Sequence, residues 1–385
     1  MKSKQTIING LSGTVIGLYI RLDVLRMAWK WSQNLVGYLH VLQGLKRMVN
    51  QYLGENIRRR YVKVDGRYHW NLYIPGWKTL AYTKNIESEA FRFAPNGNKA
   101  NRFTNVFLAI TSRCPLRCEH CFEWDVLNGS DTLSLADLKS IVNRIQQVGS
   151  GQIQFSGGEP MLRIDDLIEI LHSAMHDTEF WMLTSGYNLT LLNAQRLKQA
   201  GLDGVVVSLD HFDPEKHNQF RGNPHAFEWA EKAIVNSIEA NLVTSISLCA
   251  TNSFATEENL MRYMEMAKAL GVSFVQILEP QAVGHYKGMP VSLETANIKI
   301  IEDFYFRMMQ DKAYAKYPII CYHGHYQRKA GCFGAGNRSL YVDPYGGLNP
   351  CPFCRQKAGN ALTEDIVAVA NRFQKQGCLM HPSFK

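Results

Sequence analysis

An alternation of apolar strands and amphipathic helices, repeated six times, most constrains the fold of this 385-residue chain. A strand followed by a helix returns the chain to the same end of a sheet, so the alternation is typical of parallel sheets. The predicted strands are residues 106–111, 153–156, 180–184, 204–209, 245–250 and 273–278. The predicted helices are residues 135–148, 165–176, 193–200, 226–240 and 257–270. This pattern predicts an α/β fold, a partial (β/α)6 barrel of the TIM type that is open on one side.

The remaining segments have patterns of their own. A turn at Asp65-Gly66 between alternating residues predicts a β-hairpin, and the cap Ser134-x-x-Asp137 with the stop at Gly149 bounds the first barrel helix. The expected units are a basic amphipathic helical extension (1–60), a β-hairpin with a polar linker (61–102) and the barrel (103–290). A linking helix (291–317) and a small Cys- and Gly-rich domain (318–385) follow.

The basic charge is concentrated in the first of these units. The chain has a net charge of +8, and residues 1–60 hold ten Lys and Arg against two Asp and Glu, so the rest of the chain is neutral. No nucleic-acid partner is expected, because such binders spread basic residues along a groove. Neither a cleavable signal peptide nor a transmembrane helix is apparent, and we expect a cytoplasmic protein.

Within residues 1–60, one helix shows a clear apolar face. It is formed by Leu35, Tyr38, Leu42, Leu45, Val49 and Tyr52. Amphipathic helices with basic residues can lie on an anionic membrane surface, here its inner face. The alternative is that this face packs against the barrel or a second subunit.

Three cysteines follow the first predicted strand directly, in the order Cys114, Cys118 and Cys121. Three thiolates on one loop can hold three irons of a 4Fe–4S cube, which leaves the fourth iron open to a small molecule. Because barrel enzymes place their chemistry at the C-terminal ends of the strands, this loop is a predicted catalytic site. A structural zinc loop with His120 as the fourth ligand is the alternative.

The second predicted strand ends in a glycine-rich turn that contains Gly157, Gly158 and Glu159. The two glycines allow the backbone to approach a ligand closely, and a carboxylate can accept hydrogen bonds from an ammonium group. This turn and the cysteine loop follow neighbouring strands, so we expect them to lie side by side at the mouth of the barrel.

On these residues the chain resembles the radical S-adenosylmethionine (radical SAM) superfamily. The CxxxCxxC loop, the aromatic Phe122 after it, the GGEP motif and the six-unit barrel carry the resemblance, across roughly residues 104–290. It implies an enzyme that receives an electron from a flavodoxin or ferredoxin and cleaves S-adenosylmethionine. The resulting 5′-deoxyadenosyl radical would abstract hydrogen from a substrate C–H bond.

The resemblance also implies roles for individual residues. Cys114, Cys118 and Cys121 would bind the catalytic 4Fe–4S cluster. The residues implied to bind S-adenosylmethionine are Gly157, Gly158 and Glu159 at the methionyl amino group, Phe122 by the adenine, Ser208 and Asp210 near the ribose, and Thr251, Asn252 and Leu278 around the nucleotide.

A second cysteine group lies near the C-terminus and comprises Cys332, Cys351, Cys354 and Cys378. Its Cys-x13-Gly-x4-Cys run resembles the opening of SPASM and twitch extensions, which implies a hairpin around Gly346 and one auxiliary 4Fe–4S cluster. The sequence does not contain the CxxCx5CxxxC block of a full SPASM domain, which favours the shorter, twitch-like form. A four-thiolate zinc site is the alternative, and Cys321 is an alternative ligand.

Other candidates stand near the predicted strand ends. Cys249 is interpreted as a hydrogen-atom donor or as a buried apolar thiol. Proton transfer is the interpretation for Asp210, His211, His285 and Tyr286, although the two histidines fit ordinary loop positions equally well.

The sequence therefore predicts a radical SAM enzyme with two substrate hypotheses: a peptide or protein, or a small or lipid-like molecule at a membrane surface. A non-catalytic iron–sulfur or zinc scaffold is the rival class of protein. Production of 5′-deoxyadenosine distinguishes the enzyme from the scaffold.

Overall fold

The computed structural model describes residues 5–32, 34–52, 60–92, 101–332, 334 and 336–378. Its centre is a nine-stranded sheet in the order β10-β9-β8-β7-β6-β5-β4-β11-β12. Among the described residues the two end strands do not pair with each other, so the barrel is open. The six predicted strands are confirmed as β4 (Phe103–Thr111), β5 (Ser150–Gly157), β6 (Glu179–Thr184), β7 (Gly204–Ser208), β8 (Val243–Cys249) and β9 (Phe274–Leu278).

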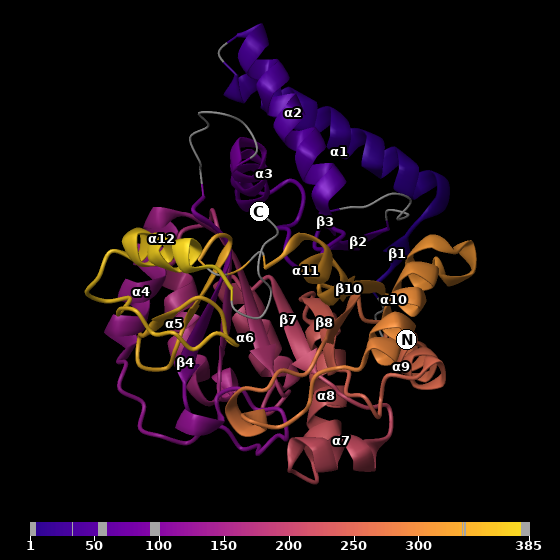
Figure 1. Ribbon diagram of the computed structural model, residues 1–385, viewed down its shortest axis with the longest axis vertical. Helices are drawn as coiled ribbons and strands as arrows, with labels where there is room; N and C mark the ends of the chain where they lie inside the picture. Colours follow the sequence, from indigo (N-terminus) through magenta and orange to yellow (C-terminus); the bar gives the residue numbers. More distant parts are fainter. Residues whose placement is uncertain are drawn as a thin grey trace.

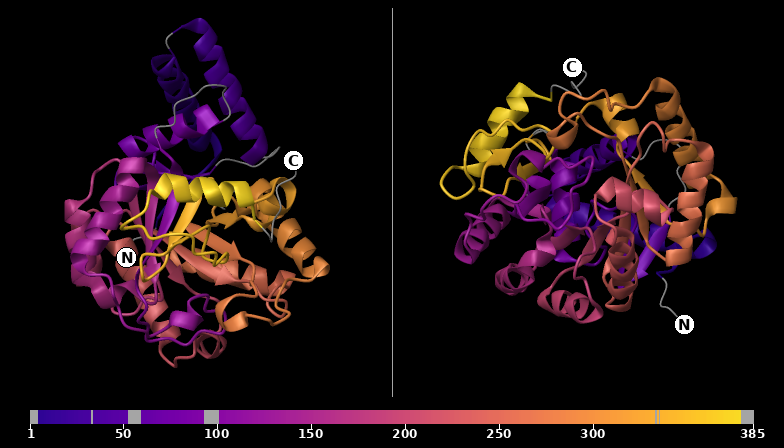
Figure 2. Two further views of the ribbon diagram at one scale, coloured as in Figure 1. Left: turned by 60° about the vertical axis from the view of Figure 1, so that its left-hand side comes forward. Right: turned by 90° about the horizontal axis from the view of Figure 1, so that it is seen from below.

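The predicted barrel helices cover the outer side of this curved sheet (Figure 1, Figure 2). Ser134 and Asp137 make both bonds of the expected capping box, and Gly149 ends that helix at a φ of 84°. The helices are α4 (Leu135–Val148), α5 (Ile164–Ser173), α6 (Leu191–Ala200), α8 (Ala226–Glu239) and α9 (Glu257–Leu270). Because helices cover the outer face and side chains fill the interior, strands such as β8 are buried along their whole length.

Strand β10 (Ile319–Tyr322), helix α7 (Pro214–Arg221) and the pairing of the first hairpin strand, β11 (Ser339–Val342), with the barrel were not predicted. Strand β10 pairs in parallel with β9, and β11 pairs in parallel with β4. Helix α7 follows β7. All three are short, so too few residues repeat for a periodic pattern to stand out.

The C-terminal segment is therefore built into the barrel rather than set apart from it. The expected hairpin around Gly346 forms between β11 and β12 (Leu348–Asn349). The linking helix is α10 (Thr295–Gln310), and the other C-terminal helices are α11 (Gly324–Ala330) and α12 (Ile366–Gln376), which lies beside α4 in Figure 1.

The N-terminal segment forms a second packed unit. Strands β1 (Ile7–Ile8), β2 (Tyr61–Val64) and β3 (Arg67–His69) make a small antiparallel sheet, with the expected positive-φ turn at Asp65-Gly66. Helices α1 (Gly10–Trp31) and α2 (Leu35–Tyr52) extend away from the barrel (Figure 1). Helix α3 (Leu80–Arg92) occupies the segment expected to be a polar linker, of which residues 93–100 lie outside the described residues.

The apolar face predicted for α2 is buried only in part. Leu45 is buried and Tyr38 and Leu42 are partly buried in a core shared with α1 and α3, whereas Leu35 is 63% exposed. The side chains of Val49 and Tyr52 lie outside the described residues. Arg60, counted with the basic extension, is buried and donates hydrogen bonds to the carbonyl oxygens of Met308, Tyr314 and Tyr317.

Candidate active site

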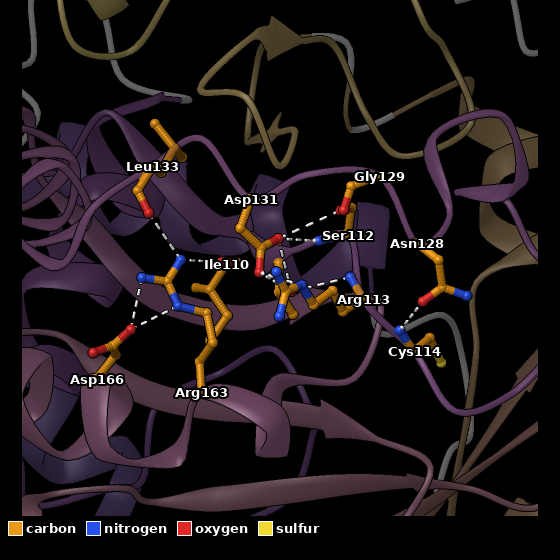
Figure 3. A network of polar contacts seen from close by, with 11 residues as sticks. Ile110, Ser112, Arg113, Cys114, Asn128, Gly129, Asp131, Leu133, Arg163 and Asp166 are labelled. Atoms are coloured by element: carbon orange, nitrogen blue, oxygen red, sulfur yellow. Dashed lines mark hydrogen bonds and ion pairs between the residues drawn. The ribbon is translucent and has the colours of Figure 1, made fainter.

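The cysteine loop leaves the C-terminal end of β4, and polar contacts hold its base (Figure 3). The Asp131 carboxylate accepts hydrogen bonds from the Thr111 hydroxyl and the Ser112 N–H, each at 2.9 Å, and lies 3.6 Å from Arg113. The Asn128 side-chain oxygen accepts the Cys114 N–H at 2.9 Å. These bonds give the first cysteine a defined position before any ligand binds.

The three thiols of the loop lie in one small apolar cluster. Leu116 and Ala226 pack with Cys118 at its centre, and Cys114 and Cys121 border it. Burial raises the pKa of all three thiols, to about 12 for Cys121. Keeping them as thiolates therefore requires compensating positive charge, which the irons of a cluster would supply, so the three residues fit the group that the sequence implied.

His120, the fourth ligand of the zinc alternative, has another position. Its ring stacks on Phe220 with centroids 4.7 Å apart, and burial lowers its pKa to about 4. In the part of the chain that the structure describes, no group of three or more His, Cys, Asp or Glu side chains is arranged to hold a single metal ion.

Arg221, at the end of α7, links the loop to the barrel interior. Its guanidinium lies 3.6 Å from the Cys118 Sγ and forms a buried ion pair with Asp210 at 2.5 Å. Its carbonyl oxygen accepts the Arg117 N–H. Gly222 has a positive φ, and a side chain there would collide with the Arg117 carbonyl. The end of α7 thus supports the loop and places a cation beside one of its thiols.

The turn after β9 holds the other side of the loop. The His285 N–H donates to the Cys121 carbonyl at 3.0 Å, and the His285 ring stacks on Trp124 with centroids 3.7 Å apart. A Cβ on Gly284 would collide with the Cys121 carbonyl. His285 was predicted as a proton-transfer or loop residue, and its contacts are those of a loop-positioning residue.

The glycine-rich turn lies against the base of the cysteine loop, as expected. The Gly158 and Glu159 N–H groups donate to the Thr111 and Arg113 carbonyls, both at 2.8 Å. A Cβ on Gly157 or Gly158 would strike these same carbonyls. Both residues must therefore be glycine for the two strand ends to meet.

Glu159 differs from the expectation of a direct contact with an ammonium group. It is fully buried, and its carboxylate accepts hydrogen bonds from Met161, Thr184 and Ser185. Both oxygens are used within the chain, so the side chain connects the ends of β5 and β6. Its effect on a ligand would pass through the backbone of Gly157 and Gly158.

Asp210 also differs from the role of a free acid at the barrel mouth. One oxygen pairs with Arg221, and the other accepts the Cys249 N–H at 2.9 Å. Burial opposes ionisation, but the Arg221 charge outweighs burial and the pKa of Asp210 is lowered. This arrangement suits a positioning residue. The Cys249 thiol is buried beside this pair, with Tyr286 close to it.

Several other predicted site residues hold loops near the strand ends. The Asn252 side chain accepts the Glu294 N–H at 2.9 Å and donates to the Ser292 carbonyl at 3.0 Å. The His211 ring accepts the Asp213 N–H at 2.8 Å. Contacts with S-adenosylmethionine stay predictions for Phe122, Ser208, Thr251, Asn252 and Leu278, and so does hydrogen-atom donation by Cys249.

The four C-terminal thiols are brought together from separate elements. The Cys351 and Cys378 side chains interact with Cys354, which lowers the pKa of Cys354 to about 6, and the Cys354 backbone N–H donates to the Cys351 Sγ at 3.3 Å. Cys332 interacts with Cys378 and Cys354. Cys321, the alternative ligand, is instead buried in β10, where its thiol interacts with Tyr73 and the Leu72 backbone.

Arg355 joins this thiol group to the cysteine loop. It follows Cys354 directly, and its guanidinium donates to the Phe122 carbonyl at 2.7 Å and pairs with the buried Glu123 at 2.8 Å. The Phe122 ring packs edge-on against Tyr341 and Phe353. The two cysteine groups therefore share a packed and charged interface, which no sequence signal indicated.

Comparison with known proteins agrees with this geometry. Residues 108–277 match the model of the radical SAM superfamily. SuiB of Streptococcus suis bound to its precursor peptide SuiA is similar in fold, with a TM-score of 0.56 and 16% identity over 69% of this chain and 64% of SuiB. Native anSMEcpe with bound AdoMet and Cp18Cys peptide has a TM-score of 0.55 and 18% identity over 73% of this chain and 84% of that chain.

Residues 108–277 therefore carry a radical SAM domain, which is built as an open parallel barrel with three cysteines after its first strand. The chain spans about 64% of the length of SuiB. The described helices of the chain include none with the length and apolar character needed to cross a membrane.

Arg221 gives the first testable consequence of this site. Hydrogen bonds and charge near cluster sulfurs tune the reduction potential, so Arg221→Gln should make the potential of the catalytic cluster more negative while its iron is retained. The single variant leaves Asp210 buried without its cation, which costs roughly 3–5 kcal/mol of stability. Redox titration followed by electron paramagnetic resonance measures the potential, and thermal unfolding measures the stability.

The double variant Arg221→Gln with Asp210→Asn separates the two effects. Its neutral pair should recover much of the stability, and the potential should return part of the way because the negative charge of Asp210 is removed together with the cation. A potential equal to that of the unmodified protein in both the single and the double variant would show that Arg221 acts only in folding.

Proposed function

We propose that this enzyme abstracts hydrogen from a C–H bond of a peptide and carries one auxiliary 4Fe–4S cluster. The observation that supports it is the four-thiol group of Cys332, Cys351, Cys354 and Cys378, held against the catalytic loop through Arg355. When bound, the catalytic cluster supplies the electron that cleaves S-adenosylmethionine to methionine and the 5′-deoxyadenosyl radical. Four thiolates suit a cubane or zinc, and we assign the cubane because it accompanies a radical SAM barrel.

The residues of the chain then bind, orient and exclude water. Glu159 holds the ends of β5 and β6 so that the backbone of Gly157 and Gly158 can meet the methionyl group. His285 and Arg221 fix the loop from two sides. Packing of Phe122 against Tyr341 and Phe353 fills the side of the site nearest the C-terminal segment and would exclude solvent there.

The peptide substrate is supported by the fold neighbours. SuiB and anSMEcpe, which share this fold, are both seen bound to peptides. A flavodoxin or ferredoxin is the proposed electron donor, and the cytoplasm at the inner face of a membrane is the proposed location. The second candidate substrate, a lipid-like molecule, is favoured by a separate observation: long apolar side chains are exposed on α1 and α2.

Deuterium transfer distinguishes the substrate classes without knowledge of the exact substrate. Cells grown in heavy water supply a peptide fraction and a lipid extract, each returned to ordinary water so that only C–D bonds keep deuterium. The reconstituted enzyme is given S-adenosylmethionine, a strong reductant and one fraction. Mass spectrometry of the released 5′-deoxyadenosine should show one deuterium with the peptide fraction and none with the lipid extract.

Deuterium that came from the lipid extract alone would replace the peptide proposal with the lipid-like alternative. Unlabelled 5′-deoxyadenosine with both fractions would exclude a peptide and a lipid as the substrate and would indicate another small molecule.

A further inference from the structure

Helix α1 exposes an apolar stripe on the side away from its packed face. The exposed residues are Leu11, Val15, Leu18, Leu22, Leu25 and Trp29, between 40% and 88% exposed. Their spacing of three and four residues keeps them on one side of the helix over about 30 Å. The buried residues Gly13, Gly17, Ile20 and Met27 lie on the opposite side. α1 therefore has a face for the protein and a second apolar face that the described residues do not cover.

The stripe continues onto α2. The exposed Trp29 contacts Tyr38 edge-on, with ring centroids 5.4 Å apart, and Leu35, Val36 and Leu39 of α2 are each at least 50% exposed. Contiguous exposed apolar surface of this extent is uncommon on a soluble protein unless it serves an interface. Figure 1 shows the two helices standing clear of the barrel, so this surface can approach a flat partner.

The charges that flank the stripe have one sign. At 100° per residue, Arg21 lies on one side of the stripe and Arg26 and Lys30 lie on the other, and all three are exposed. The one acidic residue of α1, Asp23, is half-buried and accepts the Trp77 indole N–H at 2.9 Å. Helix α2 adds Lys46 and no acidic residue.

We infer that the α1 stripe seats the enzyme on an anionic lipid surface. The leucines would enter the acyl boundary while Arg21, Arg26 and Lys30 extend toward headgroup phosphates. Tyr19 and Trp29 are exposed on the same side and have the amphipathic rings that gather at such boundaries. This contact with a lipid surface is independent of the proposed peptide substrate, because it involves a different surface of the protein and needs no catalysis.

A second copy of the chain is the other occupant to consider. Pairing two stripes would bring the basic flanks of both copies together, and like charges beside an apolar seam oppose association. Anionic headgroups meet the same flanks with the opposite sign. Charge complementarity therefore favours the lipid surface.

Vesicle binding of the full-length protein tests the inference. The probes are vesicles of phosphatidylcholine with increasing phosphatidylglycerol, and the partition coefficient is measured by co-sedimentation without reductant or S-adenosylmethionine. Binding should rise with phosphatidylglycerol and fall with salt, because headgroup attraction is screened. Arg21→Gln, Arg26→Gln and Lys30→Gln together should weaken binding on the order of a hundredfold, about fivefold for each charge.

The apolar part has its own variant and matched controls. Leu18→Glu with Leu22→Glu, the stripe variant, should weaken binding more than about tenfold. The reason is that two apolar side chains that would be buried in the lipid are lost. Leu192→Glu changes a leucine on α6 that is 66% exposed, and Lys216→Gln, Lys312→Gln and Lys375→Gln remove three exposed charges elsewhere. Both controls should bind vesicles nearly as the unmodified protein does, and unfolding temperatures show whether each variant is folded.

Two outcomes would overturn the inference. The first is vesicle binding that is absent, or that the stripe variant and the Leu192→Glu control reduce equally. The second is a dimer in analytical ultracentrifugation that the stripe variant dissociates, with no vesicle binding, which would assign the stripe to a second copy.

Discussion

Replacing Cys114, Cys118 and Cys121 with alanine should reduce release of 5′-deoxyadenosine from S-adenosylmethionine to the level of the enzyme-free control. These thiols lie together on the loop and are the proposed ligands of the catalytic cluster, so without them no iron should be held at the mouth of the barrel to deliver an electron. The measurement is 5′-deoxyadenosine by liquid chromatography after anaerobic reconstitution and reduction. Because the loop is also held by backbone bonds to Asn128 and the His285 turn, the barrel should stay folded.

The matched control for this prediction is Cys321→Ala, which removes one buried thiol that belongs to neither cysteine group. It should retain the cleavage of S-adenosylmethionine. Cleavage that continued undiminished in the triple variant would overturn the assignment of the catalytic loop.

Replacing Cys332, Cys351, Cys354 and Cys378 together should lower the iron content from about eight to about four atoms per chain. The four thiols interact with one another and are the proposed ligands of one cluster, so removing them should eliminate that cluster and leave the loop cluster in place. Iron and sulfide analysis gives the count, and cleavage of S-adenosylmethionine reports that the remaining cluster is the catalytic one.

Arg355 supplies the control for this second prediction. Arg355→Gln removes the bond to Phe122 and the ion pair with Glu123, but no thiol, and it should leave the iron count near eight. Stoichiometric zinc in the unmodified protein, with iron at about four atoms, would contradict the auxiliary cluster and support the four-thiolate zinc site.

The barrel and the position of its cysteine loop could be predicted from local sequence patterns. Each inner strand is buried on both faces and each covering helix on one face. The local periodicity of apolar residues therefore predicts the order of strands and helices. Cys114, Cys118 and Cys121 are close in sequence, and a loop after a parallel strand must lie at the mouth. The capping box at Ser134 and the turn at Asp65-Gly66 are equally local, and the structure confirms both of them together with the open barrel.

Contacts between distant segments were decided only by the tertiary structure. Arg221 reaches Cys118 across 103 residues, and Arg355 reaches Phe122 across 233. Neither residue repeats in a pattern, because an ion pair or a single hydrogen bond requires only one side chain at the right place in space. Strands β10 and β11 also pair with strands that are distant in sequence, β9 and β4: each is four residues long and gains its stability from the neighbour it joins.

The N-terminal helices show the same division within one element. Apolar residues occur on both sides of α1, so periodicity could predict a helix but not which side the protein buries. Packing against α2 and α3 covered the side with Ile20 and Met27, and on this side Gly17 lets the Tyr61 hydroxyl of β2 approach closely. The side with Leu18 and Leu22 was left facing outward because no other described element reaches it.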